Sequence, residues 1–180
     1  MFLGRLDEHK RLPLLLAAFA QVRAALPTAR LVIAGPDDKG YLAQLRRVAA
    51  ELHLTPFVHF PGLVEGATKT ALFAQASVCV LPSYSENFGM AVVEALAHAR
   101  PVVVTEGVDI GPEIAEAGAG LVVPPDAGAL AGALLQLLRD PVAAHAMGQR
   151  GRAMVETRYN ADVVATQMLA VYQQLIQTHS

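Results

Sequence analysis

Short, nearly continuous apolar runs alternate along this chain with longer stretches of helical periodicity, and this alternation restricts the fold more than any other feature. Runs without polar alternation indicate strands that are buried on both faces. A repeated strand–helix–strand unit indicates a parallel sheet with helices on both sides. We therefore expect an α/β domain with a doubly wound parallel sheet of about six strands, Rossmann-like and three-layered. The expected strands are Phe2–Gly4, Leu31–Ala34, Val58–Pro61, Val78–Leu81, Val102–Thr105 and Leu121–Val123.

Helical stretches separate these runs and continue after the last of them. Asp126 and Asn160 are suited to cap two of the helices. The final helix carries apolar side chains at helical spacing, so one of its faces should dock on something. We treat residues 1–180 as a single domain, with residues 160–180 as a terminal helix that docks on this domain or on a missing N-terminal one. The expected helices are Leu12–Leu26, Tyr41–Leu52, Lys69–Ala76, Met90–Ala97, Pro112–Ala117, Ala127–Leu138, Val142–Val155 and Ala161–Ile176.

The composition argues against several functional classes. Hydrophobic residues make up 53% of the chain, enough for a sizeable core, and a net charge of -2 does not favour nucleic-acid binding. The single cysteine, Cys79, allows no disulfide framework, so a reducing cytoplasm is the expected location. No apolar run approaches the roughly 20 residues that cross a bilayer. The chain opens on an expected strand without a signal-peptide pattern, which suggests a longer parent protein.

The stretch from Pro82 to Ala97 carries the most chemistry, because it follows an apolar strand and leads into a helix. In doubly wound sheets, ligands bind beyond the carboxyl ends of the strands. If the helix begins near Gly89, its first N–H groups lack partners within the helix and favour a bound phosphate. Gly89 also lets a ligand approach the backbone closely. We expect the amides of Gly89 and Met90 to lie near the phosphates of a nucleotide.

Two glutamates, Glu86 and Glu94, lie on either side of this helix start. Eight residues of ideal helix rise about 12 Å, which is close to the distance from ribose to hexose in a nucleotide sugar. A carboxylate repels a diphosphate, but it accepts hydrogen bonds from vicinal hydroxyls. We therefore assign Glu94 to the ribose and Glu86 to the transferred sugar. Taken alone, the same spacing also fits two solvated surface glutamates, which are the more common case.

A second loop with binding chemistry follows the first expected strand. Gly4 eases a tight turn there, Arg5 can bind a diphosphate as a fork, and Lys10 can bind it as a point charge. In a transferase this charge would stabilise the leaving nucleoside diphosphate, a task that a metal performs elsewhere. Taken singly, both cations also fit an ordinary surface. No ligand spacing indicates a metal site, and neither a G-x-G-x-x-G after the first strand nor a P-loop motif is present.

The segment Pro-Ser-Tyr-Ser-Glu-Asn-Phe-Gly-Met-Ala-Val-Val-Glu-Ala-Leu-Ala, with seven residues between Glu86 and Glu94, resembles the signature of group 1 glycosyltransferases. These enzymes form glycosyltransferase family 4 and have the GT-B fold. The likeness covers almost the whole chain. Its other parts are Phe2-Leu3-Gly4-Arg5-Leu6 with Lys10, Leu31-Val32-Ile33-Ala34-Gly35, Phe60-Pro61-Gly62-Leu63 and Gly118-Ala119-Gly120-Leu121-Val122-Val123.

The resemblance implies a role for each matching residue. The cations of the first loop would hold the donor diphosphate, the first glutamate would bind the transferred sugar, and the second would bind the ribose. The loop around Gly62 and Leu63 would meet the base. The implied catalytic residues are Arg5, Lys10 and Glu86, and the implied donor-binding residues are Gly4, Gly62, Leu63, Glu86, Asn87, Phe88, Gly89, Met90 and Glu94.

Two positions depart from the family's pattern. Relatives often have Gly after the lysine, where this chain has Arg11. They also tend to have Cys-Gly before the proline that opens the fifth strand, where this chain has His98-Ala99-Arg100-Pro101. Neither change removes an implied ligand, but both fall in loops whose geometry influences donor preference.

The resemblance implies the donor-binding half of a retaining, metal-independent hexosyltransferase that uses a UDP-, GDP- or ADP-sugar. A GT-B enzyme has two Rossmann-like domains, and this chain supplies the second. The acceptor site would lie in the missing N-terminal domain, so the isolated chain should be inactive. Any peripheral association with the inner membrane face would come through that half or a lipid acceptor. Three alternatives stay open: a non-catalytic nucleotide-binding or interaction module, a sugar-nucleotide 2-epimerase-like enzyme, and a doubly wound domain with an unrelated ligand.

Overall fold

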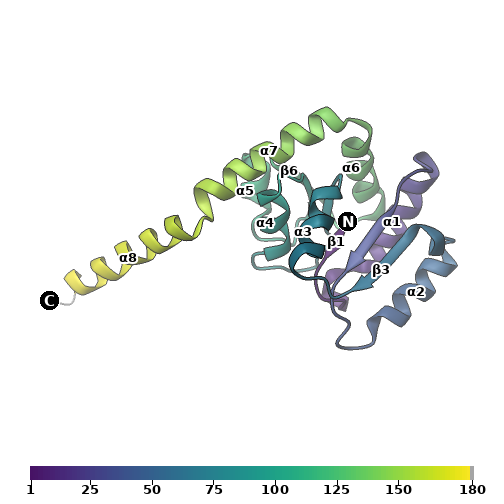
Figure 1. Cartoon of the computed structure of the whole chain (residues 1–180), viewed down its shortest axis with the longest axis horizontal. Coiled ribbons are helices and arrows are strands. Elements are labelled where there is room, and N and C mark those ends of the chain that lie inside the picture. The colour runs from purple at the N-terminus through teal and green to yellow at the C-terminus, as the bar shows by residue number, and fades with distance from the viewer. Residues whose placement is uncertain (179–180) are drawn as a thin grey trace.

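Six short parallel strands form the centre of the molecule in the computed structural model, which describes residues 1–178 (Figure 1). They form two three-stranded sheets, ordered β1-β2-β3 and β4-β5-β6. The strands are β1 (Phe2–Leu3), β2 (Leu31–Ala34), β3 (Val58–Gly62), β4 (Cys79–Leu81), β5 (Val102–Thr105) and β6 (Gly120–Val123).

The two sheets meet edge to edge at the start of the chain. The Met1 amino group donates to the Val78 carbonyl at 2.6 Å, and the Val80 amide donates to the Met1 carbonyl at 2.9 Å. The resulting strand order, 3-2-1-4-5-6, is that of a doubly wound nucleotide-binding fold. The predicted fold class is therefore confirmed, with β1 and β4 as the central pair.

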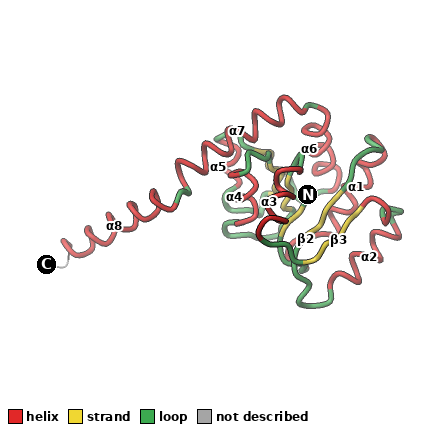
Figure 2. The backbone as a smooth tube through the Cα atoms, in the orientation of Figure 1, coloured by secondary structure: helices red, strands yellow, loops and turns green. Residues whose placement is uncertain are grey.

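Helices cover both faces of this sheet (Figure 2). One layer contains α1, α2 and α6, with α1 packed on α6. On the other face α4 packs on α7, and Phe73 of α3 stacks on His98 beyond the end of α4. The helices are α1 (Leu12–Ala25), α2 (Tyr41–Glu51), α3 (Gly66–Gln75), α4 (Met90–Ala97), α5 (Gly111–Glu116), α6 (Ala127–Arg139), α7 (Pro141–Arg158) and α8 (Ala161–Thr178), with the 3-10 helices η1 (Glu8–Lys10) and η2 (Thr55–Phe57).

The helix boundaries follow the predicted caps in most places. The Asp126 side chain accepts from the Ala129 amide at 2.9 Å, and the Asn160 side chain accepts from the Asp162 amide at 3.0 Å. The start of α3 was predicted wrongly at Lys69, because the helix begins at Gly66. Glycine and threonine have low helix propensity, so this first turn gave no helical signal in the sequence.

The last helix, α8, extends away from the domain and contacts α7 at its base (Figure 1). Several of its apolar side chains are exposed to solvent: Val164 is 39% exposed and Met168 51%. The docking partner of α8 stays a prediction. No helix within residues 1–178 combines the length and hydropathy that a membrane span needs.

Candidate functional site

A cleft of about 540 Å³ opens at the carboxyl ends of β1 and β4. The chain leaves β1 toward one helix layer and β4 toward the other, so the loops after these strands diverge, and ligands bind at such points in doubly wound sheets. Gly62 lies at the end of β3 outside this lining, whereas every other predicted site residue belongs to it. The cleft is lined by Leu3, Gly4, Arg5, Lys10, Gly35, Pro36, Leu63, Val64, Glu65, Lys69, Leu81, Glu86, Asn87, Phe88, Gly89, Met90, Ala91 and Glu94.

The floor of the cleft depends on the close approach of the loops after β1 and β2. A Cβ atom placed on Gly35 would lie 1.8 Å from the Gly4 carbonyl oxygen, so a side chain at this position would push the two loops apart. The Leu6 amide also donates to the Pro36 carbonyl at 2.9 Å. The loop after β1, which carries Arg5, is thereby held against the loop after β2.

Lys10 and Glu86 form an ion pair inside the cleft. The lysine ends η1 and the glutamate lies in the loop after β4, so 76 residues separate them along the chain. Their side chains are only 15% and 22% exposed, which limits screening by solvent. The structure thus brings together the two residues that the sequence assigned to the diphosphate and to the transferred sugar.

Backbone hydrogen bonds hold Glu86 in place. Its amide donates to the Gly107 carbonyl at 2.8 Å, and its carbonyl accepts from the Asp109 amide at 2.9 Å. The neighbouring Tyr84 amide donates to the His9 carbonyl at 2.8 Å, which joins this loop to η1. The carboxylate therefore projects from a backbone that is already ordered, which reduces the entropy that a ligand must remove.

Glu94 lies in the second turn of α4, where it pairs with Lys69 of α3 at 2.7 Å. The two side chains are 35% and 34% exposed, so both remain accessible from the cleft. Sequence reasoning missed Lys69, because it placed this residue at the first position of a helix without a partner. The available signal was its position after the β3 loop, at the same edge of the sheet as the other candidates.

The start of α4 provides backbone donors between the two glutamates. Gly89 precedes the helix with φ +73°, a left-handed conformation that glycine adopts without strain. The amides of Met90 and Ala91 belong to the first helical turn, where N–H groups have no acceptor within the helix. Both residues line the cleft. The helix dipole adds a partial positive charge at the same place, which favours an anion.

An apolar rim and an aromatic contact complete the cleft. Leu63 and Met90 are 62% and 61% exposed, and both line its edge. Phe88 packs edge-on against the ring of Tyr159, with 5.1 Å between the ring centroids. Burial and a hydrogen bond to Glu113 raise the pKa of Tyr159 to about 12, so its hydroxyl stays protonated and keeps donating to Glu113. The ring that supports Phe88 is therefore anchored to α5.

The two departures from the family's pattern both occupy left-handed backbone. Arg11 has φ +47° and Ala99 has φ +53°. Glycine adopts this conformation without a steric penalty, whereas other L-residues rarely do. The loops therefore keep a geometry suited to glycine, although the side chains differ. Among residues 1–178, no group of three or more His, Cys, Asp or Glu side chains is placed to hold a metal ion.

The strand order, with a polar cleft at its switch point, defines a Rossmann-like α/β domain. Residues 1–154 match the family model of "Glycosyl transferases group 1", and the chain belongs to this family.

Curated relatives agree with this assignment. The chain is 34% identical to a phosphatidyl-myo-inositol mannosyltransferase of Mycolicibacterium smegmatis, over 96% of this chain and 44% of that protein. It is 30% identical to a glycogen synthase of Mycobacterium tuberculosis, over 96% of this chain and 41% of that protein. The chain therefore spans less than half the length of these relatives.

Solved structures show the same domain within longer chains. Sucrose-phosphate synthase from Thermosynechococcus elongatus matches with a TM-score of 0.87 and 32% identity, over 98% of this chain and 45% of that one. Anabaena Alr3699/HepE, solved in complex with UDP, matches with a TM-score of 0.87 and 22% identity, over 96% of this chain and 48% of that one. The second likeness shows the fold alone.

Proposed function

We propose that the cleft binds the nucleotide-diphosphate-sugar donor of a retaining glycosyltransferase, which transfers a hexosyl group to an acceptor held by a second domain. One observation carries this proposal: Glu86 and Glu94, each paired with a lysine, flank the anion-binding start of α4. The phosphates would lie at the Met90 and Ala91 amides, between a sugar at Glu86 and a ribose at Glu94. The exposed side chain of Leu63 would pack against the base.

Donor binding would exchange the partner of Lys10. In the free protein its ammonium neutralises Glu86. An incoming diphosphate carries more negative charge and would draw this ammonium, together with Arg5, toward itself. Glu86 would then be free to accept hydrogen bonds from sugar hydroxyls. When the bond to the sugar breaks, Arg5 and Lys10 would stabilise the charge that develops on the departing diphosphate, and no metal is required for this.

Lys69 would orient the ribose-binding carboxylate. Its ammonium lies 2.7 Å from one oxygen of Glu94, which restricts the carboxylate to a narrow range of positions. The second oxygen and the remaining lone pairs are then available to vicinal hydroxyls. The pair also reduces the repulsion between Glu94 and a nearby diphosphate.

The comparisons support a nucleotide sugar as the ligand but leave the sugar open. Alr3699/HepE was solved in complex with UDP and with UDP-glucose, whereas the curated relatives are a mannosyltransferase and a glycogen synthase. Transfer by the isolated chain is not expected, because the proposal assigns the acceptor to a second domain. We propose that a second, N-terminal domain closes the cleft and that α8 docks on it through its apolar face.

Thermal shift with UDP, GDP and ADP tests this proposal. A nucleotide at about 100 times its dissociation constant should stabilise the chain by about 2.7 kcal/mol. Glu94→Ala should remove this response, whereas Glu51→Ala, which alters an exposed i,i+4 pair on α2, should keep it. The proposal fails if none of the three nucleotides raises the melting temperature of the parent chain.

The same panel separates the alternatives. A chain that binds nucleoside diphosphates without discriminating nucleotide sugars would favour a non-catalytic nucleotide-binding module. Release of an epimerised sugar from a nucleotide sugar, detected by NMR, would favour a 2-epimerase-like enzyme. In the enzyme with both domains, the anomeric configuration of the product tests retention directly.

A further inference from the structure

The loop after β4, residues 82–89, carries Glu86 and Phe88 of the donor cleft and ends at Gly89. Gly89 has φ +73° and α4 begins at the next residue, so this glycine separates the loop from the helix. The helix orders its own first turn, where the Val92 amide donates to the Gly89 carbonyl at 2.7 Å. The loop is not helical, so its order must come from contacts with other elements.

The first of these contacts is made by the backbone of Glu86. Its amide donates to the Gly107 carbonyl at 2.8 Å, and its carbonyl accepts from the Asp109 amide at 2.9 Å. Both partners lie between β5 and α5, and α5 begins shortly after them at Gly111. A Cβ atom on Gly107 would lie 2.1 Å from the Tyr84 carbonyl oxygen, which shows how closely the two segments approach. Glu86 is therefore joined to the segment that leads into α5.

The second contact is made by the ring of Phe88, two residues further along the loop. This ring packs against that of Tyr159, with 5.1 Å between the centroids and 89° between the planes. Such edge-on aromatic pairs stabilise a structure beyond the area that they bury. Tyr159 is the C-cap of α7, where its amide donates to the Val155 carbonyl at 2.9 Å. The far end of the loop is thus held by a residue at the end of α7.

Hydrogen bonds to α5 fix the position of the Tyr159 ring. The Tyr159 hydroxyl donates to the carboxylate of Glu113, which lies on α5. Arg158 donates to the same carboxylate at 3.2 Å and to that of Glu116 at 3.2 Å. The hydrogen bond from Tyr159 holds the pKa of Glu113 below its ordinary value, so the acceptor is charged at neutral pH. A charged acceptor forms the stronger kind of hydrogen bond.

These contacts form a closed path around the loop. The path runs from Glu86 through backbone hydrogen bonds to the start of α5, and along this helix to Glu113. It continues through Tyr159 to Phe88 and returns along the chain to Glu86. Both ends of the segment 86–88 are therefore held relative to the same helix. Asn87 lies between them and lines the cleft, so its position is set by both contacts.

We propose that Tyr159 is a positioning residue for the sugar side of the donor cleft, and that it acts through Phe88 on the loop that presents Glu86. This inference rests on the proposed function, because it takes Glu86 as the contact to the transferred sugar. Tyr159 lies outside the cleft lining and touches no donor atom. The amides at the start of α4 are on the other side of Gly89, so the binding of the diphosphate should not depend on Tyr159.

Backbone order parameters of the ligand-free chain, measured by NMR, test whether Tyr159 orders the loop. In Tyr159→Leu, which lacks the ring, the values for Asn87 and Phe88 should fall from about 0.85 to below about 0.6. Tyr159→Phe keeps the ring and should retain most of the order. The value for Val92 in α4 should be the same in all three chains. Unchanged values at Asn87 and Phe88 in Tyr159→Leu would overturn the proposal.

Ligand affinities test the effect on the sugar. The probes are the nucleoside diphosphate that gives the largest thermal shift and its sugar conjugate: UDP-glucose, GDP-mannose or ADP-glucose. Tyr159→Leu should weaken the conjugate by about fivefold, the effect of one edge-on aromatic contact, and the diphosphate by less than about twofold. Tyr159→Phe should recover most of the affinity. Equal weakening of both ligands would contradict the proposal, because a residue that only stabilises the domain would affect both alike.

Two glutamates of α5 provide matched variants. Glu113→Ala removes the acceptor of the Tyr159 hydroxyl, so it should weaken the conjugate and cause no further loss when combined with Tyr159→Leu. Glu116→Ala removes only a contact to Arg158 and should leave both affinities unchanged. Additive losses in the double variant would rule out an action through Tyr159. If no nucleotide binds the parent chain, the donor proposal fails, and the order parameters alone decide whether Tyr159 orders the loop.

Discussion

The ammonium of Lys69 lies 2.7 Å from a carboxylate oxygen of Glu94, and this contact joins α3 to α4 at the wall of the donor cleft. The pair is about one third exposed on each side, so its contribution to stability is small. Its position beside the helix start gives it a function in binding instead. Because Lys69 positions Glu94, it should increase the affinity most for ligands whose ribose carries both hydroxyls.

Lys69→Met should therefore weaken UDP binding by about tenfold, the effect of one lost charge-assisted contact near 1.4 kcal/mol. The loss should be smaller for 2′-deoxy-UDP, because that ligand presents one hydroxyl fewer to Glu94. Isothermal titration of both nucleotides measures the difference. Lys39→Met, at an exposed lysine outside the cleft, is the matched control and should leave both affinities unchanged. Equal losses for the two ligands would assign Lys69 to the phosphates instead.

Lys10→Met and Glu86→Gln should distinguish the contribution of the diphosphate to binding from that of the sugar. Removing Lys10 should weaken UDP and UDP-sugar alike, by about tenfold or more, since both ligands carry the diphosphate. Glu86→Gln should weaken the UDP-sugar and leave UDP unchanged or slightly tighter, because a carboxylate near the phosphates is neutralised. Competition binding with a fluorescent nucleotide measures all four affinities. A Glu86→Gln variant that loses UDP and UDP-sugar equally would contradict the exchange of Lys10.

Ala99→Gly should stabilise the domain by about 1 kcal/mol. Ala99 has φ +53°, a conformation that costs an alanine about 1 kcal/mol and a glycine almost nothing. Chemical denaturation measures the change in the free energy of unfolding. Ala153→Gly, at an exposed site within α7, is the control and should have the opposite sign, a loss of about 0.5–1 kcal/mol. A destabilised Ala99→Gly variant would show that the loop is not strained.

The stability of the parent chain should rise with pH as the solution approaches the ordinary pKa of the Met1 amino group, 8.0. Burial lowers this pKa in the folded state, so the unfolded chain holds more protons between the two values. The free energy of unfolding therefore increases with pH in this window, and the gain is complete above pH 8 and lost at lower pH. Denaturation at several pH values measures the slope.

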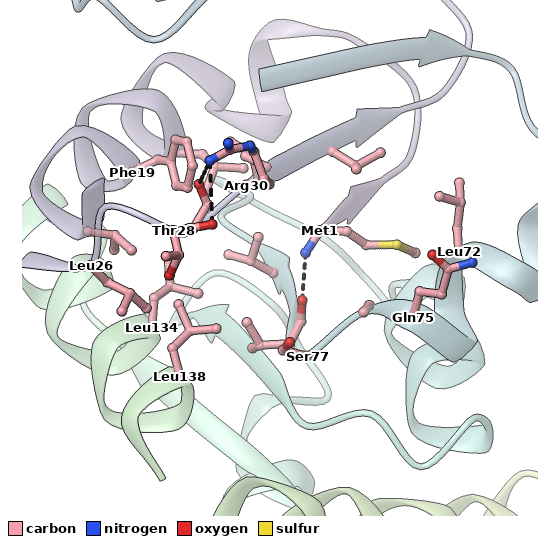
Figure 3. Close-up of a pocket in the computed structure, with 18 residues that line it drawn as sticks. Met1, Phe19, Leu26, Thr28, Arg30, Leu72, Gln75, Ser77, Leu134 and Leu138 are labelled. Atoms are coloured by element: carbon pink, nitrogen blue, oxygen red, sulfur yellow. Dashed lines mark hydrogen bonds between the residues drawn. The ribbon is translucent and has the colours of Figure 1, made fainter. Parts of the chain in front are cut away.

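Other groups contribute to any pH profile, so the informative quantity is a difference. A chain extended by Gly-Ser-Gly before Met1 carries a peptide amide in place of the buried amino group (Figure 3), and its profile should lack this part of the slope. Subtracting the two profiles isolates the Met1 contribution. Parallel profiles over the same range would show that the buried position of the amino group does not affect folding.

Much of the candidate site could be predicted because its residues lie in short segments with a local signature. The loop from Gly4 to Lys10 and the segment around Glu86 each follow a buried strand, and parallel strands place such loops at one edge. Glu86 and Glu94 lie at different positions along the axis of α4, because Glu86 precedes this helix and Glu94 lies in its second turn. Gly62 was the exception, since the cleft is lined by the residues after it, where the chain turns toward α3.

Contacts between distant segments could not be predicted in the same way. The pairing of Lys69 with Glu94 depends on the packing of α3 beside α4, and no pattern within either helix specifies that neighbour. The contact of Phe88 with Tyr159 likewise joins the donor loop to the end of α7.

The sequence by itself determined the class of fold and the chemistry of the donor loops, because hydrophobic periodicity and residue type act over a few residues. Only the tertiary structure decided which charges pair and where α8 lies. The physical reason is that these features depend on the spacing and register of elements far apart in the chain. The pairing of Lys10 with Glu86 shows this most clearly, because 76 residues separate the two side chains along the chain.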